Sequence, residues 1–246
     1  MIRTLAQALF LMGMPLLAAA AQDPAGDAEK KGDEEAQTRI TEFRKELKGC
    51  RTPEDICMAL RGLCSIRHPK ILAELWTWVQ KPEANICGEA AEQISKYEKN
   101  RMAADMLIAA ARGRRDSEGL AKCLRYAGDV KCRSIVPSLH PYLRHKDVNV
   151  AREAACSLGK LGAALSIEPL IKLAREVDAN IPEGSADGAP LPGLSGPGMD
   201  DARQRRDALM PAVYQALKNI TGEIWKNPKD WDSWWKKHKN TFKERE

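Results

Sequence analysis

The sequence has few of the residues from which catalytic and metal-binding sites are usually built. Aromatic residues make up 5 % of the chain, and the 4 histidines are scattered without matched acidic or nucleophilic partners. The motifs typical of serine hydrolases, phosphate loops, dinucleotide sites and zinc proteases (GxSxG, GxxxxGK[ST], GxGxxG, HExxH) are missing. We therefore expect no catalytic residue, no bound metal and no cofactor.

Cysteine pairs of the kind that bind zinc are also missing. The chain has 7 cysteines, but no CxxC pair occurs and the histidines do not cluster with them. An odd number leaves at least one thiol unpaired in a monomer. Cys123 and Cys132 lie symmetrically about a turn at Gly128, so antiparallel helices could bring them together. Buried free thiols are the alternative, because cysteine packs well as a small hydrophobic residue.

Long uncharged runs are limited to the N-terminus. Arg3 precedes an uncharged run from Leu5 to Leu17, and four alanines follow at 18–21. This pattern is typical of a secretory signal peptide, which we assign to residues 1–21. An uncleaved anchor is the alternative, but the run is short for a bilayer span. We predict a secreted or periplasmic protein with no membrane span after signal cleavage.

The next segment is poor in large apolar residues. Residues 22–48 are rich in Asp, Glu, Lys, Ala and Gly, so we predict a flexible charged spacer. From residue 49 to 222, apolar positions recur with helical spacing and suggest successive helices. Inside this region, residues 180–200 are dense in Pro and Gly and lack periodicity. We predict a disordered loop there, with a partner-contacting flap as the alternative.

The helical region repeats with a period of about 32 residues, which is typical of stacked helix pairs. One unit of this size cannot bury its own apolar face, so neighbouring units create the core. Two series carry the period, the second lying four residues after the first: Ile71, Met102, Ile135 and Ile167, then Leu75, Met106, Leu139 and Ile171. The prediction is an all-α fold, an α-solenoid of antiparallel helix pairs.

The clearest unit is SIVPSLHPYL (134–143) followed by REAACSLGKLG (152–162). It resembles the HEAT-like repeat family, particularly the short bacterial form related to phycobilisome-lyase repeats. That pattern has a Pro in the first helix, an Asp in the turn and VRxxAAxALGxLG in the second helix. The resemblance implies inter-repeat hydrogen bonds at Asp147 and Arg152, and no chemistry. Some HEAT-like enzymes bind iron through His-Glu pairs, but no His-Glu dipeptide occurs here.

The last segment, 223–246, is rich in tryptophan. Trp231, Trp234, Trp235 and His238 follow i, i+3, i+4, i+7 spacing, which places them on one helical face. We predict a helical C-terminal cap, because a terminal repeat must cover its apolar flank. Exposed tryptophans that bind carbohydrate or a partner are the rival interpretation.

Basic residues are most concentrated near the middle of the chain, and the net charge of +5 is too small to indicate nucleic-acid binding by itself. If exposed, this cluster would form an interaction surface for a polyanion or polysaccharide. Its members are Arg112, Arg114, Arg115, Lys122 and Arg125.

The resulting hypothesis is a non-catalytic module of the bacterial envelope that binds or scaffolds a protein partner. Binding of carbohydrate or a polyanion, through the tryptophan tail or the basic cluster, is the alternative. The sequence does not identify the partner.

Overall fold

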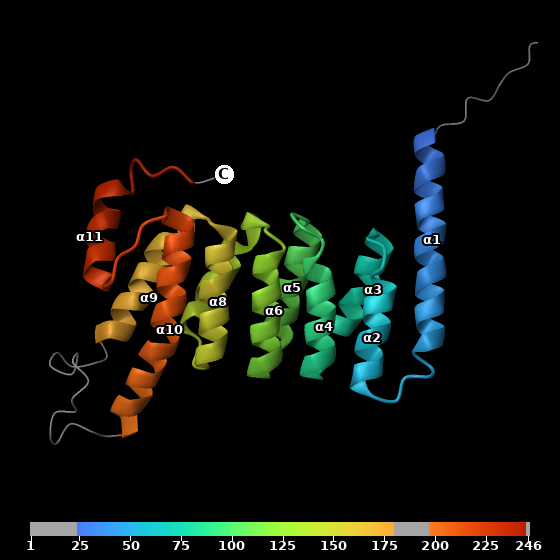
Figure 1. The fold of residues 1–246 in the computed structure, drawn as a ribbon, viewed down its shortest axis with the longest axis horizontal. Coiled ribbons are helices and arrows are strands. Elements are labelled where there is room, and N and C mark those ends of the chain that lie inside the picture. The colour runs from blue at the N-terminus through green and yellow to red at the C-terminus, as the bar shows by residue number, and fades with distance from the viewer. Residues whose placement is uncertain (1–23, 180–196, 245–246) are drawn as a thin grey trace, which may run out of the picture.

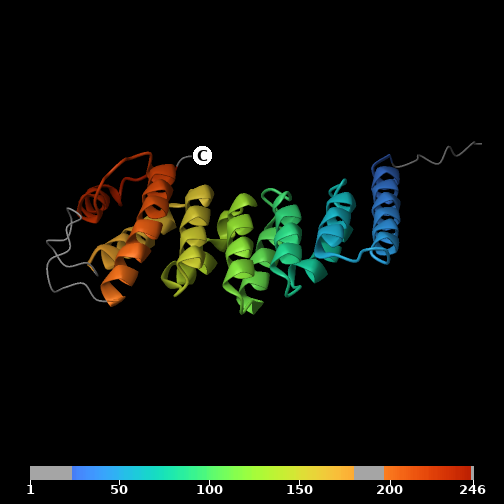
Figure 2. The ribbon, with the colours of Figure 1, turned by 60° about the horizontal axis from the view of Figure 1, so that its bottom comes forward.

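The computed structural model describes residues 24–179 and 197–244 of the chain. Within these ranges the protein is helical and has no strands, and its helices stand side by side in an elongated two-layer stack (Figures 1 and 2). The predicted all-α solenoid is confirmed. The predicted signal peptide, 1–21, and residues 180–196 of the predicted loop lie outside the described ranges. None of the described helices combines the length and apolar character needed to cross a bilayer.

One layer, here called the second-helix layer, contains the later helix of each pair. Neighbouring helices in this layer make the most extensive contacts of the fold, above all α6 with α8 and α8 with α10. Its members are α2 (Pro53–Leu63), α4 (Ala84–Ser95), α6 (Ser117–Asp129), α8 (Val148–Leu161) and α10 (Pro197–Thr221).

The opposite layer, called the first-helix layer, contains the earlier helix of each pair and continues into the C-terminal helix. It comprises α3 (Pro69–Val79), α5 (Arg101–Gly113), the segment η1 (Arg133–Ile135), α7 (Val136–Leu139) and η2 (His140–Arg144), then η3 (Ala164–Ser166) with α9 (Ile167–Ala179), and α11 (Pro228–His238).

The segment 133–144 is less regular than the single first helix that the sequence predicts for 134–143. It breaks into two 3₁₀ turns around four α-helical residues. Pro141 has no backbone N–H, and its ring would clash with the carbonyl of Pro137 one α-helical turn earlier. The tighter 3₁₀ geometry avoids this clash over short stretches.

The second-helix layer is held together by small residues. A Cβ atom added to Gly128 of α6 would lie 2.8 Å from the Cα of Ser157 in α8. A Cβ atom added to Gly159 of α8 would lie 2.7 Å from the Cα of Ala216 in α10. Only glycine permits backbones this close. The hydroxyl of Ser157 also donates to the carbonyl of Leu124 at 2.7 Å, which satisfies the buried polar group.

Left-handed residues follow the second helices at a regular spacing. Lys99 and Lys131, after α4 and α6, both have φ of 57°, and Gly162 after α8 has φ of 65°. These residues recur at the repeat period, but only Gly162 is itself the C-cap residue of its helix. Lysine is strained in this conformation, whereas glycine is not.

The N-terminal segment differs from its prediction. Residues 24–46 form the helix α1 (Pro24–Glu46), so the prediction of a flexible spacer over 22–48 is wrong for this part. Ala36, Ile40 and Phe43 are buried, and Phe43 packs edge-on against Trp78 at 5.6 Å between ring centres. Their i, i+4, i+7 spacing gives α1 a narrow apolar stripe that its many charged residues conceal in the composition.

At the other end, α11 packs against α9 and extends the first-helix layer (Figure 1). Trp231 is completely buried, and its Nε1 donates to the carbonyl of Trp225 at 3.2 Å. The prediction of a helical C-terminal cap is confirmed.

Candidate functional site

The predicted basic cluster is not one free surface. Arg114 is 95 % buried as a side chain, and its guanidinium donates to the carbonyls of Lys81 and Pro82 at 2.8 and 2.9 Å. It therefore satisfies the backbone that follows α3. Lys122 likewise donates to the carbonyl of Ala84 and pairs with Glu118 at 2.8 Å.

Arg125 is used in the same way, in a two-pronged ion pair with Glu153 at 2.9 and 3.1 Å. Arg112 donates to the hydroxyl of Ser138. Arg115 is exposed and makes no ion pair with the described residues. Four of the five side chains thus bind a neighbouring element, which gives polyanion binding no structural support.

The two repeat positions behave differently from each other. Asp147 accepts from the backbone N–H of Asn149 and Val150, so it caps α8. Burial would raise the pKa of Asp147, but the hydrogen bond from Ser117 of the preceding pair and those backbone donors bring it below its usual value. Arg152 lies 3.6 Å from Glu153 of its own helix and not across the repeat.

The inter-repeat ion pairs were not predicted from the sequence, where Arg125 is named only as a member of the basic cluster. Arg61 of α2 binds Glu89 of α4 at 2.7 Å, and Arg125 of α6 binds Glu153 of α8. Glu89 and Glu153 are largely buried. In both pairs the glutamate follows the arginine at the same spacing in the sequence, and the two pairs lie two repeat periods apart. This recurrence is the sequence pattern that could have revealed the ion pairs.

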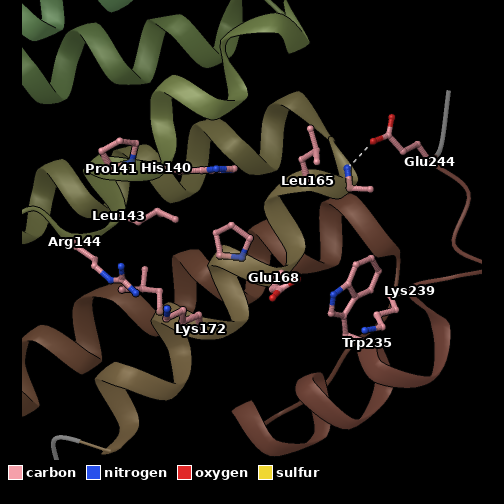
Figure 3. A pocket seen from close by; sticks show the side chains of 13 residues that line it. His140, Pro141, Leu143, Arg144, Leu165, Glu168, Lys172, Trp235, Lys239 and Glu244 are labelled. Carbon is pink, nitrogen blue, oxygen red and sulfur yellow. Dashed lines mark hydrogen bonds between the residues drawn. The ribbon is translucent and has the colours of Figure 1, made fainter.

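A hollow of about 950 Å³ lies in the first-helix layer near the C-terminus. We call it the C-terminal groove. Figure 3 shows His140 and Leu143 on one side, Trp235 on the other, and Glu168 and Lys172 of α9 between them. It therefore opens where the irregular segment 133–144, α9 and α11 meet.

A second hollow of about 520 Å³ continues the groove along α9. The two hollows share four lining residues, so they form one elongated depression between α9 and α11. The shared residues are Glu168, Lys172, Trp235 and Lys239. Arg175 of α9 lies 3.6 Å from Asp232 of α11 along the second part.

Some charged side chains of the groove form ion pairs with the described residues, and others do not. Arg144 forms a close two-pronged ion pair with Glu176. Lys172 and Lys239 are exposed and take part in no ion pair with the described residues, and neither does Glu168. Lys172 also acts electrostatically on Glu176 and lowers its pKa. Five basic side chains line the two hollows against four acidic ones, so the groove carries a slight excess of positive charge.

The apolar part of the groove is built by the tryptophan cluster and by α9. Trp234 stacks on Trp235 with ring centres 6.1 Å apart, and Trp235 is half-buried. Leu165 is an exposed large hydrophobic side chain, with 69 % of its surface accessible. Trp231 thus supports the cap, while Trp235 supplies an accessible aromatic surface.

Two ring nitrogens at the groove lack hydrogen-bond partners within the described part of the chain. They are Nε1 of Trp235 and Nε2 of His140. Burial lowers the pKa of His140 below its ordinary value, so its ring is neutral at pH 7.

The groove already holds one carboxylate at its rim. Glu244 accepts from the backbone N–H of Ala164 at 2.7 Å and from Arg133 at 2.8 Å (Figure 3 shows the first bond). The first backbone N–H groups of a helix have no partner within the helix, so they readily donate hydrogen bonds to a carboxylate. The site therefore suits acidic groups next to an apolar surface.

No group of three His, Cys, Asp or Glu side chains within 24–179 and 197–244 is arranged to hold a metal ion. The features that the groove does offer are shape, exposed apolar area and unpaired positive charge. These are features of recognition.

Comparison with known proteins gives one result. Residues 104–184, from α5 to just beyond α9, match the family model for HEAT repeats, over about a third of the chain. A search of curated proteins gave no significant match. The HEAT match supports a HEAT-like repeat protein, and such repeats generally mediate protein–protein interaction or scaffolding.

Proposed function

We propose that this protein is a non-catalytic binding module of the bacterial envelope, and that its C-terminal groove docks an extended acidic segment of a partner protein. One observation carries this proposal: Lys172 and Lys239 lie unpaired beside the accessible surfaces of Trp235 and Leu165. The phycobilisome-lyase subtype is a further part of the proposal, supported only by the sequence pattern.

The shape of the groove favours a peptide over a small molecule. It follows α9, whose 13 residues span about 20 Å at 1.5 Å per residue. An extended chain covers that length with about six residues. Both hollows together would hold such a segment, with its side chains alternating between the groove and solvent.

The apolar contacts supply the expected affinity. Interfaces depend on a few buried anchors, among which tryptophan is prominent. A bound segment that covers Leu165 and the face of Trp235 would remove apolar area from water at about 25 cal/mol per Å². We expect one apolar side chain of the partner to sit between these two residues.

The charges supply the expected specificity. Unpaired lysines at a rim mainly select partners and speed association, and they repel basic segments. Glu244 illustrates how a carboxylate is received, through a backbone N–H and an arginine. The partner segment is therefore acidic on either side of its apolar anchor.

Export from the cytoplasm is part of the proposal and is supported by the signal-peptide pattern of residues 1–21. Fractionation of the native cell, followed by mass measurement of the mature N-terminus, tests it. Processing near residue 21 is expected, and an unprocessed cytoplasmic protein would contradict it.

A displayed random-peptide library selected on the mature protein tests the docking proposal. We expect enrichment of sequences with Asp or Glu flanking an aromatic or aliphatic residue. The double variant Lys172→Glu/Lys239→Glu should lose these peptides by at least tenfold in affinity.

The matched control is Lys45→Glu/Lys48→Glu, which makes the same charge change at the end of α1, far from the groove. It should bind the peptides as the wild type does. Equal loss in both variants, or enrichment of basic peptides, would contradict the proposal.

A further inference from the structure

Two thiols meet in the interior of the second-helix layer. Cys87 of α4 and Cys123 of α6 are both completely buried, with their sulfur atoms 3.6 Å apart. The other cysteines are only partly buried. This contact joins two neighbouring repeats across 36 positions of sequence. It also differs from the pairing of Cys123 with Cys132 that the sequence left open.

We propose that Cys87 and Cys123 form a disulfide that staples α4 to α6. Bonded sulfurs lie about 2.05 Å apart, so closing the present gap requires a shift of about 1.5 Å. The two sulfurs already face each other across an interface between packed helices.

In the folded contact the two thiols differ in acidity. The pKa of Cys87 lies below its ordinary value, because the contact with Cys123 and then the charge of Arg114 favour its thiolate. Arg114 is itself held in place by the backbone after α3 and by Asp116. Cys123 is the less acidic partner, since its pKa is raised by the same contact and by burial.

The oxidant is a disulfide of the thiol-exchange class, such as oxidised glutathione or a disulfide-donating oxidoreductase. A thiolate of this pair attacks that disulfide, its S–S bond breaks, and one oxidant thiolate leaves. The second protein thiolate then attacks the mixed disulfide and releases the other oxidant thiolate. Two electrons pass to the oxidant, and the two protein thiol protons end on its released sulfurs.

Burial determines when this happens. Both sulfurs are closed to solvent in the folded protein. The first exchange with the oxidant therefore occurs during folding, before α4 and α6 have packed against each other. Once formed, the bond is shielded from reductants. In a repeat protein, stability is nearly a sum of nearest-neighbour interfaces, so the staple strengthens the α4–α6 interface most.

The test uses the full mature protein, refolded with a mixture of reduced and oxidised glutathione. Thiols are counted in denaturant, and peptides are mapped by mass spectrometry without reduction. We expect two fewer thiols than the seven of the sequence, and one linked peptide pair containing Cys87 and Cys123. Cys57→Ser should keep this linkage, whereas Cys87→Ser should abolish it.

The melting temperature provides a second measurement. Closing a loop of this length should raise the Tm of the oxidised protein over its reduced form by about 5–15 °C. In Cys87→Ala the two conditions should give equal Tm values. Seven free thiols after refolding, or a linkage of Cys123 to Cys132, would overturn the proposal. Neither result would bear on the docking proposal, because peptide binding to the C-terminal groove is measured separately.

Discussion

The two layers of the solenoid use the same repeats in different ways. In the second-helix layer, Gly128 and Gly159 let the backbones of consecutive helices approach closely. In the first-helix layer near the C-terminus, the proline-rich segment 133–144 is irregular and Trp235 stands between α9 and the solvent. The resulting hollow is the C-terminal groove.

This difference teaches where stability and recognition reside. Small residues and buried ion pairs, such as Arg125 with Glu153, hold the second-helix layer together. The groove keeps accessible apolar surface and the unpaired Lys172 and Lys239. A change in the first group should lower stability, and a change in the second should lower binding.

The C-terminal cap offers the largest expected effect. Its helix α11 contains one tryptophan that serves stability, Trp231, and one that lines the groove, Trp235. Trp231→Ala removes a completely buried indole and should lower the unfolding free energy by about 3–5 kcal/mol. Trp235→Ala removes a half-buried one and should cost less than about 2 kcal/mol. Denaturant titration measures both, and equal losses would contradict the division of roles.

The close helix approach is tested by adding one methyl group. Gly159→Ala places a Cβ atom 2.7 Å from the Cα of Ala216 and should cost about 1–3 kcal/mol, although alanine favours helix. The control is Gly113→Ala in α5, where no atom lies within 4 Å. It should be neutral or slightly stabilising. A loss of stability in Gly113→Ala as large as in Gly159→Ala would refute the close-packing argument.

The buried ion pair gives a pH-dependent prediction. Burial would raise the pKa of Glu153, but the hydrogen bonds and charge of Arg125 bring it below its usual value. Its stabilising contribution is therefore present above the unfolded pKa of about 4.3 and is lost as the pH falls through the lower folded pKa.

Arg125→Met should cost about 1–2 kcal/mol at pH 7, a reduced figure because Arg125 is half-exposed. Without the guanidinium, burial should raise the pKa of Glu153 above its unfolded value. The stability difference from wild type should then shrink as the pH falls from 7 to 4. Denaturation at several pH values measures this, and a constant difference would exclude the mechanism.

The smallest expected effect concerns Lys99, the left-handed residue that follows α4. Lys99→Gly relieves a lysine from the left-handed region and should stabilise the protein by about 0.5–1 kcal/mol. Lys96→Gly, at a right-handed position three residues earlier, should destabilise it by a similar amount. Thermal unfolding of both variants decides whether backbone strain is the cause.

The sequence predicts the repeat architecture well, because most of the periodic apolar positions, such as Ile135 and Leu139, are buried. Met102 of the same series is the exception and is 61 % exposed. The start of α2 is likewise a local feature, because the hydroxyl of Thr52 accepts from the backbone N–H of Asp55 in a capping box. The sequence prediction fails for α1, where a stripe of only Ala36, Ile40 and Phe43 is hidden among charges. The apolar stripe is present in the sequence, but the many charged residues around it led to the prediction of a flexible spacer.

The candidate site could not be predicted in the same way. Arg114 and Lys122 look free in the sequence, yet backbone carbonyls some 30 to 40 positions away bind them. The groove arises from elements that are distant in sequence, η2, α9 and α11. Trp235 was recognised, but whether it faced the core or a hollow depends on how α11 packs on α9.

The most direct test of the whole account is hydrogen–deuterium exchange of the mature protein with and without the best acidic peptide from the selection. We predict slower exchange confined to η2, α9 and α11. Exchange in the second-helix layer should stay unchanged. Protection that maps to residues 112–125, or to the second-helix layer instead, would contradict the account.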